Sequence, residues 1–333
     1  MSRWLGILIG TLLAVGLVAR ARSTTLRILA GLAPPVLATA MLFTFSRGAW
    51  LGLAVGLIVV FAFDPRRLQW AVAVLLLAPW PAIVIAAVER SDSLPNQSAT
   101  IPALEQAGEQ LFWVILASTA LSALAATALV VAERRIDVRP VVRRSFALVL
   151  AALALAGIVA VSVEKGAPWT VASNVWRDFN APPREDTAAN VTDRLFDLSS
   201  TGRIDLWRVS WSDFRDHPLD GTGSGSFEVA WAASPRWWFA TTEGHSLYLE
   251  TLGELGVVGL ALLLSVLALP LVAFARVRQE PLAAVPLGAY AAFVAHAGVD
   301  WDWELAGVTV VALLSGAALL VLARGGNRPT RLG

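Results

Sequence analysis

The chain has 333 residues, of which 56% are hydrophobic and only 15% are charged, so it is too apolar for a soluble domain and is typical of a multi-spanning membrane protein. Its formal net charge is +1, and every basic residue except Lys165 is an arginine. There is no cysteine, which excludes disulfides, thiolate catalysis and cysteine metal sites.

Apolar runs close to the ~20 residues that a membrane span needs predict an all-α polytopic membrane protein with about nine transmembrane helices. The runs lie at about 4–19, 28–45, 49–63, 68–88, 110–132, 145–163, 256–275, 282–299 and 304–323. Backbone amides in a bilayer must be satisfied within their own segment, so these runs should be helical despite abundant valine and isoleucine. The first run follows Arg3 and is not followed by an Ala-x-Ala cleavage site, so we expect it to be retained.

The arginines of the short loops predict the orientation in the membrane. Fifteen fall on one side of the predicted spans, namely Arg20, Arg22, Arg27, Arg66, Arg67, Arg134, Arg135, Arg139, Arg143, Arg144, Arg276, Arg278, Arg324, Arg328 and Arg331. Only Arg3, Arg47 and Arg90 fall on the other side. The positive-inside rule therefore predicts an external amino terminus, a cytoplasmic carboxyl terminus and one large external segment between helices 6 and 7.

These boundaries divide the chain into three parts: amino-terminal membrane helices (1–163, about six spans), an external catalytic loop (164–255), and carboxyl-terminal membrane helices with a short cytoplasmic tail (256–333, about three spans). The first half of the external segment, rich in proline and asparagine, is expected to be irregular. Between Arg203 and His217, an apolar face predicts an amphipathic helix, with its residues spaced at steps of three and four: Ile204, Trp207, Trp211 and Phe214.

Ser200 or Thr201 could cap this helix and Pro218 should end it. Two locations are expected for its indole-rich face. The face lies either on the membrane surface or against the helix bundle, or it is buried in a small core formed by the loop itself. The stretch from Gly221 to Phe227 has alternating glycines that could cradle a phosphate, but it lacks the features of a nucleotide-binding loop. A flexible turn is the better interpretation.

Three histidines are present, and His245 is the strongest candidate for chemistry. It lies where the predicted external segment meets the next apolar run and precedes a predicted helix start, where Ser246 could cap and free amides favour an anion. An imidazole can accept a proton near neutral pH, as a general base for an acceptor hydroxyl must. His217 is expected to be structural. His296 lies near an acidic and aromatic cluster, Asp300 to Glu304, that is expected to be structural first and acceptor-contacting second.

Arg47 lies between two apolar runs on the side where positive charge is scarce. An ionisable group at membrane depth usually has a partner. A lipid phosphate would supply one, because guanidinium binds phosphate oxygens bidentately, either as a specific ligand or as ordinary membrane lipid. No metal site is expected: the histidines are scattered, and Asp300-Trp301-Asp302 is the one external Asp-x-Asp sequence.

Four motifs follow one another in the chain: Ser46-Arg47-Gly48, Ser200-Thr201-Gly202-Arg203, Asp216-His217-Pro218-Leu219 with Gly221 and Gly223, and His245-Ser246, which nine residues separate from the pair Gly256 and Gly259. Because these motifs occur in this order and all lie on the predicted external side, the chain from about residue 28 to 304 resembles the O-antigen ligase and polymerase superfamily of membrane glycosyltransferases. The spacing from His-Ser to Gly-x-x-Gly is fairly specific, whereas Ser-Arg-Gly alone is weak.

The resemblance implies transfer of a glycan from undecaprenyl pyrophosphate to an acceptor hydroxyl, on a glycan, lipid or protein, at the outer face of the bacterial cytoplasmic membrane. By that resemblance His245 is the catalytic histidine, Arg47 and Arg203 bind the pyrophosphate, and Ser46, Ser246, Gly256 and Gly259 support the motifs. No cofactor, metal or nucleic-acid partner is implied. The physical interpretation agrees, since guanidinium groups would stabilise charge on the leaving pyrophosphate.

Family members usually have several more spans before Ser-Arg-Gly than the two expected here. The sequence therefore leaves open a surface-polysaccharide polymerase, a lipid-linked glycan transporter or flippase, and an inactive shortened scaffold. A transporter should place charges deep within its spans, whereas here they gather at one external face, which favours an enzyme.

Overall fold

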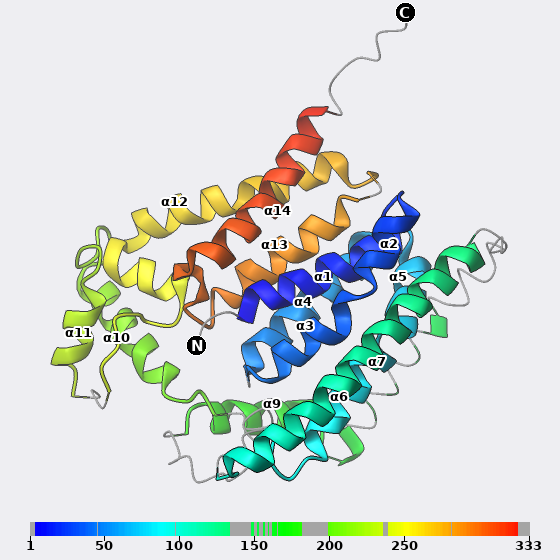
Figure 1. Cartoon of the computed structure of the whole chain (residues 1–333). Helices are drawn as coiled ribbons and strands as arrows, with labels where there is room; N and C mark the ends of the chain where they lie inside the picture. The colour runs from blue at the N-terminus through cyan, green and yellow to red at the C-terminus, as the bar shows by residue number, and fades with distance from the viewer. Residues whose placement is uncertain are drawn as a thin grey trace, which may run out of the picture.

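The structure is a computed structural model that describes residues 4–44, 46–96, 98–133, 166–181, 199–235, 239–280 and 282–325, with a few positions between 148 and 164. The regular elements among these residues are all helices (Figure 1). They are α1 (Trp4–Arg20), α2 (Thr24–Ala30), α3 (Ala33–Leu42), α4 (Arg47–Phe63), α5 (Arg67–Leu77), α6 (Pro79–Glu89), α7 (Ile101–Glu133), α9 (Pro168–Phe179), α10 (Arg203–Asp216), α11 (Phe227–Ala233), α12 (Leu247–Val277), α13 (Ala284–His296), the 3₁₀ turn η2 (Asp302–Glu304) and α14 (Ala306–Gly325).

Five helical stretches are long and apolar enough to cross a membrane: Thr24–Leu42, Arg67–Glu89, Ile101–Glu133, Leu247–Val277 and Ala306–Gly325. Shorter apolar helices cover Ile7–Arg20, Arg47–Phe63 and Ala284–His296. The all-α membrane class is thus confirmed, whereas the predicted number of nine spans is not. The predicted run at 145–163 lies largely outside the described residues.

Two predicted spans are each built from two consecutive helices. The run at 28–45 comprises α2 and α3, and the run at 68–88 comprises α5 and α6. Pro34 and Pro35 lie in the first turn of α3, and Pro79 begins α6. Proline has no amide hydrogen, so it is tolerated in the first turn of a helix but breaks the preceding one.

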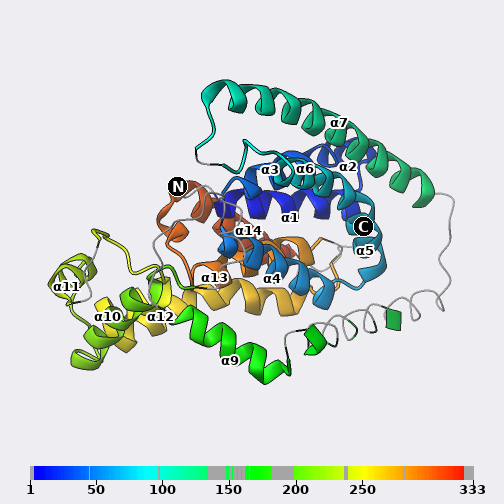
Figure 2. The same cartoon turned by 90° about the horizontal axis from the view of Figure 1, so that it is seen from below.

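Helix α1 lies within the bundle and is covered by several other helices (Figures 1 and 2). Leu8, Ile9 and Leu12 are almost completely buried against residues of α3, α4, α13 and α14. Further along α1, Val18 packs in a second cluster around Trp70 of α5. Helix α7 packs along α6, so the bundle is held by apolar contacts along the helix lengths.

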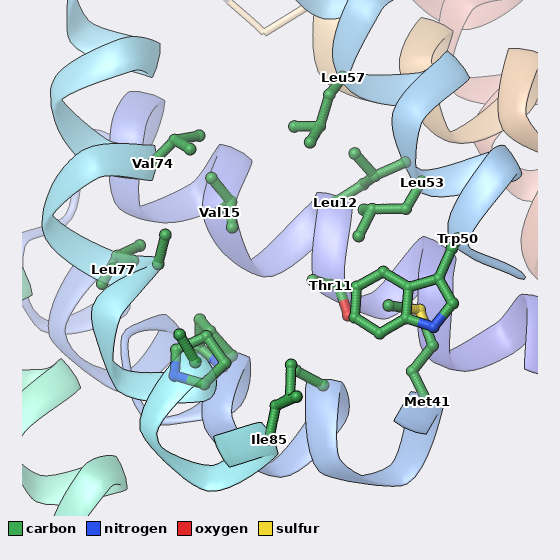
Figure 3. A pocket seen from close by; sticks show the side chains of 15 residues that line it. Thr11, Leu12, Val15, Met41, Trp50, Leu53, Leu57, Val74, Leu77 and Ile85 are labelled. Atoms are coloured by element: carbon green, nitrogen blue, oxygen red, sulfur yellow. The ribbon is translucent and has the colours of Figure 1, made fainter. Parts of the chain in front are cut away.

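An apolar cavity of about 220 Å³ lies between α1, α3, α4, α5 and α6 (Figure 3). Leu12, Met41, Trp50, Leu77 and Ile85 are among the side chains that line it. Trp50 belongs to the first turns of α4, the helix that begins at Arg47. The cavity therefore begins close to one end of the bundle.

Helices α10 and α11 lie at the end of the bundle where α12 begins (Figures 1 and 2). The predicted amphipathic helix is α10, and Leu206 and Val209 of α10 pack with Phe227 and Trp231 of α11. The loop therefore has a small core of its own, but this core is not formed by the predicted indole-rich face: only Trp207 of that face packs partly against it, and Trp211 is exposed.

Two details of the segment between the sixth and seventh predicted spans were predicted wrongly. Its first half was expected to be irregular but contains α9, which begins at Pro168 and ends at Phe179. The residue before α10 is Gly202, at φ 88°, with no side-chain cap from Ser200 or Thr201. Proline and asparagine suggested a loop, yet Pro168 lies in the first turn of α9, and the left-handed backbone before α10 suits glycine.

Candidate active site

His245 lies in a short loop that is fixed on both sides. Its backbone is left-handed at φ 55°, which is unusual for a residue with a side chain. Before it, the amide of Gly244 donates to Oε2 of the buried Glu250 at 2.6 Å. After it, Ser246 caps α12 by accepting from the amide of Leu249, as predicted, and the amide of Leu247 donates to the carbonyl of Ala297 at 2.8 Å. The loop therefore holds a half-buried imidazole in a set position.

The hydrogen bonds of this imidazole identify its available nitrogen. Nδ1 of His245 lies 3.2 Å from the carbonyl oxygen of Glu243. A carbonyl oxygen only accepts, so Nδ1 must carry the proton and Nε2 keeps its lone pair. The Glu243 carbonyl thus selects the tautomer in which Nε2 can act as a base.

The surroundings of His245 also favour its neutral form. Burial lowers its pKa below the ordinary histidine value, and the positive charge of Arg203 lowers it further, while Asp300 acts in the opposite direction. A neutral imidazole near pH 7 can accept a proton from a hydroxyl.

Arg203, the first residue of α10, forms an ion pair with Asp300, and Nη2 and Oδ2 are 2.9 Å apart. A second guanidinium nitrogen, Nη1, donates to Oγ1 of Thr201 at 3.0 Å. The amide of Trp301 donates to the other oxygen of Asp300, and the Trp301 ring lies 6.3 Å from the ring of His245. Residues that are far apart in sequence are thus brought into one cluster.

Arg47 begins α4, and Ser46 caps that helix by accepting from the amide of Ala49 at 3.2 Å. The next residue, Gly48, packs against the imidazole of His296 at the end of α13. His296 is four residues before Asp300, whose amide donates to the His296 carbonyl at 3.0 Å. The start of α4 therefore lies against the same end of α13 that leads to the partner of Arg203.

The acidic cluster after α13 was expected to be structural first and acceptor-contacting second, and two of its carboxylates contact other side chains of the protein. Asp300 and Asp302 are buried, and Oδ2 of Asp302 lies 3.6 Å from Nδ1 of the buried His296. Asp300 was missed as the partner of Arg203. The available signal was its charge at the end of a predicted span, because an ionisable group at such a depth usually has a partner.

The two glycines of the last motif have different environments. Gly256 interrupts α12 with φ 62° and ψ −166°. A side chain there would meet the backbone of Leu219 at 2.3 Å. Gly259 is helical, and a Cβ on it would lie 2.2 Å from Cβ of Leu255. A glycine is therefore required at Gly256 by both its backbone conformation and its neighbour.

The interruption at Gly256 explains how two distant motifs fit together. The amides of Val257 and Val258 donate to acceptors outside α12, namely the carbonyls of Pro218 and Leu219. In return, the carbonyls of Gly253 and Glu254 accept from the amides of Thr222 and Gly223. These bonds satisfy backbone groups that a helix break leaves unpaired.

The glycine-rich turn was predicted to be flexible, but these hydrogen bonds fix it to α12. The backbone of Gly221 approaches Glu254 so closely that an added Cβ would lie 2.2 Å from the Glu254 carbonyl. The amides of Thr222 and Gly223 are occupied by α12 carbonyls and do not cradle a phosphate. Within the described part of the chain, no group of three histidine, aspartate or glutamate side chains is placed to hold a metal ion.

The site thus combines a neutral imidazole with an available nitrogen and a guanidinium held by a carboxylate, beside the end of the bundle where α4 and α12 begin. Such groups can remove a proton from a hydroxyl and stabilise an anion.

Comparison with known proteins gives one family match. The O-antigen ligase family model matches residues 110–264, a stretch that includes Arg203, His245, Gly256 and Gly259 and ends before Asp300. No curated protein gives a significant match. The family match bears out the resemblance over residues 110–264 and supports membership of the O-antigen ligase superfamily, whereas the first motif, Ser46-Arg47-Gly48, lies before the matched stretch.

Proposed function

We propose that this protein is a membrane glycosyltransferase that moves a glycan from undecaprenyl pyrophosphate to an acceptor hydroxyl, with His245 as general base and Arg47 and Arg203 as pyrophosphate ligands. The observation that carries the proposal is the arrangement of His245 beside the Arg203–Asp300 pair. The O-antigen ligase match supports a transferase of this superfamily.

In the proposed reaction, Nε2 of His245 takes the proton of the acceptor hydroxyl while the hydroxyl oxygen forms a bond to the anomeric carbon of the glycan. The bond from that carbon to the pyrophosphate oxygen breaks, and its electron pair leaves with undecaprenyl pyrophosphate. The guanidinium of Arg203 stabilises the charge that develops on this leaving group. Protonated His245 then returns its proton to solvent, which restores the neutral base.

Asp300 has a positioning part in this proposal. The guanidinium of Arg203 is only partly exposed, and two of its nitrogens are held by Asp300 and Thr201. Because these bonds fix the plane of the guanidinium, a pyrophosphate oxygen meets an oriented donor instead of a mobile one. In the proposal, Arg47 binds the same pyrophosphate from the first position of α4, where the amino end of the helix also favours an anion.

The apolar cavity beside Trp50 has the lining that part of an isoprenoid chain requires. Its position near the start of α4 would allow the chain to lie among the helices while the pyrophosphate reaches Arg47. The external location of the site follows from the arginine distribution and is part of the proposal.

The proposal is tested by reconstituting the purified protein in liposomes with an undecaprenyl-pyrophosphate-linked glycan and separate candidate acceptors. A transferase produces a glycosylated acceptor together with free undecaprenyl pyrophosphate. A second lipid-linked repeat unit, offered as acceptor, tests the polymerase alternative, since a polymerase extends it. A transporter instead leaves the donor covalently intact and changes only the leaflet in which it resides, a result that would refute the proposal.

A further inference from the structure

Helices α4 and α13 pack through small residues that recur at every fourth position on both helices. The facing pairs are Gly56 with Gly288, Gly52 with Ala292, and Gly48 with His296. Small residues let two helix backbones approach closely in a membrane. The last pair is different, because it places a large imidazole opposite a glycine at the end of α4 that carries Arg47.

The imidazole of His296 fills the space at this end completely. A Cβ on Gly48 would lie 2.6 Å from Nε2 of His296, well inside contact distance. On the other side, Nδ1 lies 3.6 Å from Oδ2 of Asp302, and the His296 side chain is fully buried. Neither ring nitrogen has a hydrogen-bond partner among the residues that the structure describes. Burying a polar ring in this way costs stability, and an apolar side chain would avoid that cost.

The main chain of His296 is tied to the other half of the site. Its carbonyl oxygen accepts from the amides of Val299 at 2.9 Å and Asp300 at 3.0 Å, which shapes the turn after α13. Asp300 in that turn holds Arg203. One residue therefore contacts the start of α4 through its ring and the Arg203–Asp300 pair through its backbone.

We propose that His296 is a positioning residue, whose imidazole sets the distance between the start of α4, with Arg47, and the turn that holds Arg203. This inference rests on the proposed function, because the two arginines need a set spacing only if they bind one pyrophosphate. The ring acts as a spacer of fixed size and does not contact the substrate.

The test is a double-mutant cycle on Gly48 and His296, with the Michaelis constant for the lipid-linked donor as the readout. Gly48→Ala forces the helices apart or the ring aside, so the donor KM rises while the acceptor KM stays unchanged. His296→Asn shortens the side chain and also raises the donor KM. In the double variant the shorter side chain accommodates the new methyl group, so the combined loss in kcat/KM is smaller than the product of the single losses, by about fivefold or more.

Gly52→Ala is the matched control, since its added Cβ would lie 2.6 Å from Cδ1 of Leu8, the end of a flexible side chain one turn deeper. It should lower the amount of folded protein without changing the donor KM. If the losses at Gly48 and His296 multiply, or if Gly52→Ala raises the donor KM equally, the positioning role is overturned although the transferase stands. If the wild-type protein does not consume the donor, the proposed function fails, and this inference with it.

Discussion

Replacing Asp300 with asparagine removes one charge and almost no volume, so it isolates the electrostatic part of the Arg203 contact. The pair is partly buried, with 8% of the Asp300 side chain and 27% of the Arg203 side chain exposed. A hydrogen bond to a charged group at such a site contributes about 1.5–3 kcal/mol. If that energy holds the guanidinium in its productive orientation, its loss lowers kcat/KM by about 10- to 150-fold.

The same substitution should move the pH dependence of the reaction. Asp300 raises the pKa of His245 and Arg203 lowers it, while burial lowers it most. Transfer requires neutral His245, so activity falls as the pH drops through this pKa. Asp300→Asn removes the raising effect and shifts the acidic limb to lower pH, whereas Arg203→Gln removes a lowering effect and shifts it to higher pH.

The assay is kcat/KM for the lipid-linked donor, measured between pH 5 and 9 on reconstituted protein at matched amounts. The two variants should therefore move the acidic limb in opposite directions. Shifts in the same direction for both variants, or no fall in kcat/KM for Asp300→Asn, would refute the assignment of the Arg203–Asp300 pair to the site.

Further predictions concern the arginines, the helix break and the topology. Arg47→Lys and Arg203→Lys should each lower the turnover of transfer markedly, because lysine lacks the planar fork of the guanidinium. The fold-loss in turnover of the double variant should be smaller than the product of the two single fold-losses, because both side chains bind one ligand. If lysine is tolerated at both positions and the losses are independent, the arginines are ordinary lipid anchors. Gly256→Ala should lower the free energy of unfolding by at least about 2 kcal/mol, because the added Cβ would clash with the backbone of Leu219 and the φ angle of Gly256 is positive. A thermal unfolding measurement that finds unchanged stability would contradict this prediction. Cysteines at Ser173 or Ser234, in a chain without native cysteine, should react with an impermeant thiol reagent from the outside, and labelling only after lysis would overturn the orientation.

The sequence predicted the helical class and the helix at 203–217 well, because both depend on local composition and periodicity. The predicted helix at 203–217 is α10, which ends one residue earlier. Spans were harder to delimit, since hydropathy does not report the points at which prolines divide a run, as at Pro79. Helix α9 was missed because its residues were interpreted by type instead of by spacing.

The candidate site was only partly predictable for a different reason. Arg203 and His245 could be selected from their positions in the chain, but their proximity depends on the fold. The pairing of Arg203 with Asp300 joins residues 97 positions apart, and no local pattern indicates it. Likewise, the left-handed backbone of Gly256 follows from its contact with Leu219, which the sequence does not reveal.

The exchange of hydrogen bonds around Gly256 gives a physical reason for the spacing between His245 and the glycine. Two and a half turns of α12 separate the capped start at Ser246 from the break. The start is fixed to α13 through Leu247, and the break is fixed to the turn after α10. The first segment of α12 thus holds the His245 loop against both neighbouring elements.

The most direct test of the central claim is transfer by His245→Ala in reconstituted membranes, compared with wild type at matched amounts of folded protein. The imidazole is half-buried and belongs to the loop before α12, so its removal should leave the membrane insertion and the abundance of the protein unchanged. Loss of the general base should lower turnover about 10²- to 10⁴-fold, with little change in donor binding. Near-normal turnover of this variant would show that His245 is structural and would contradict the account.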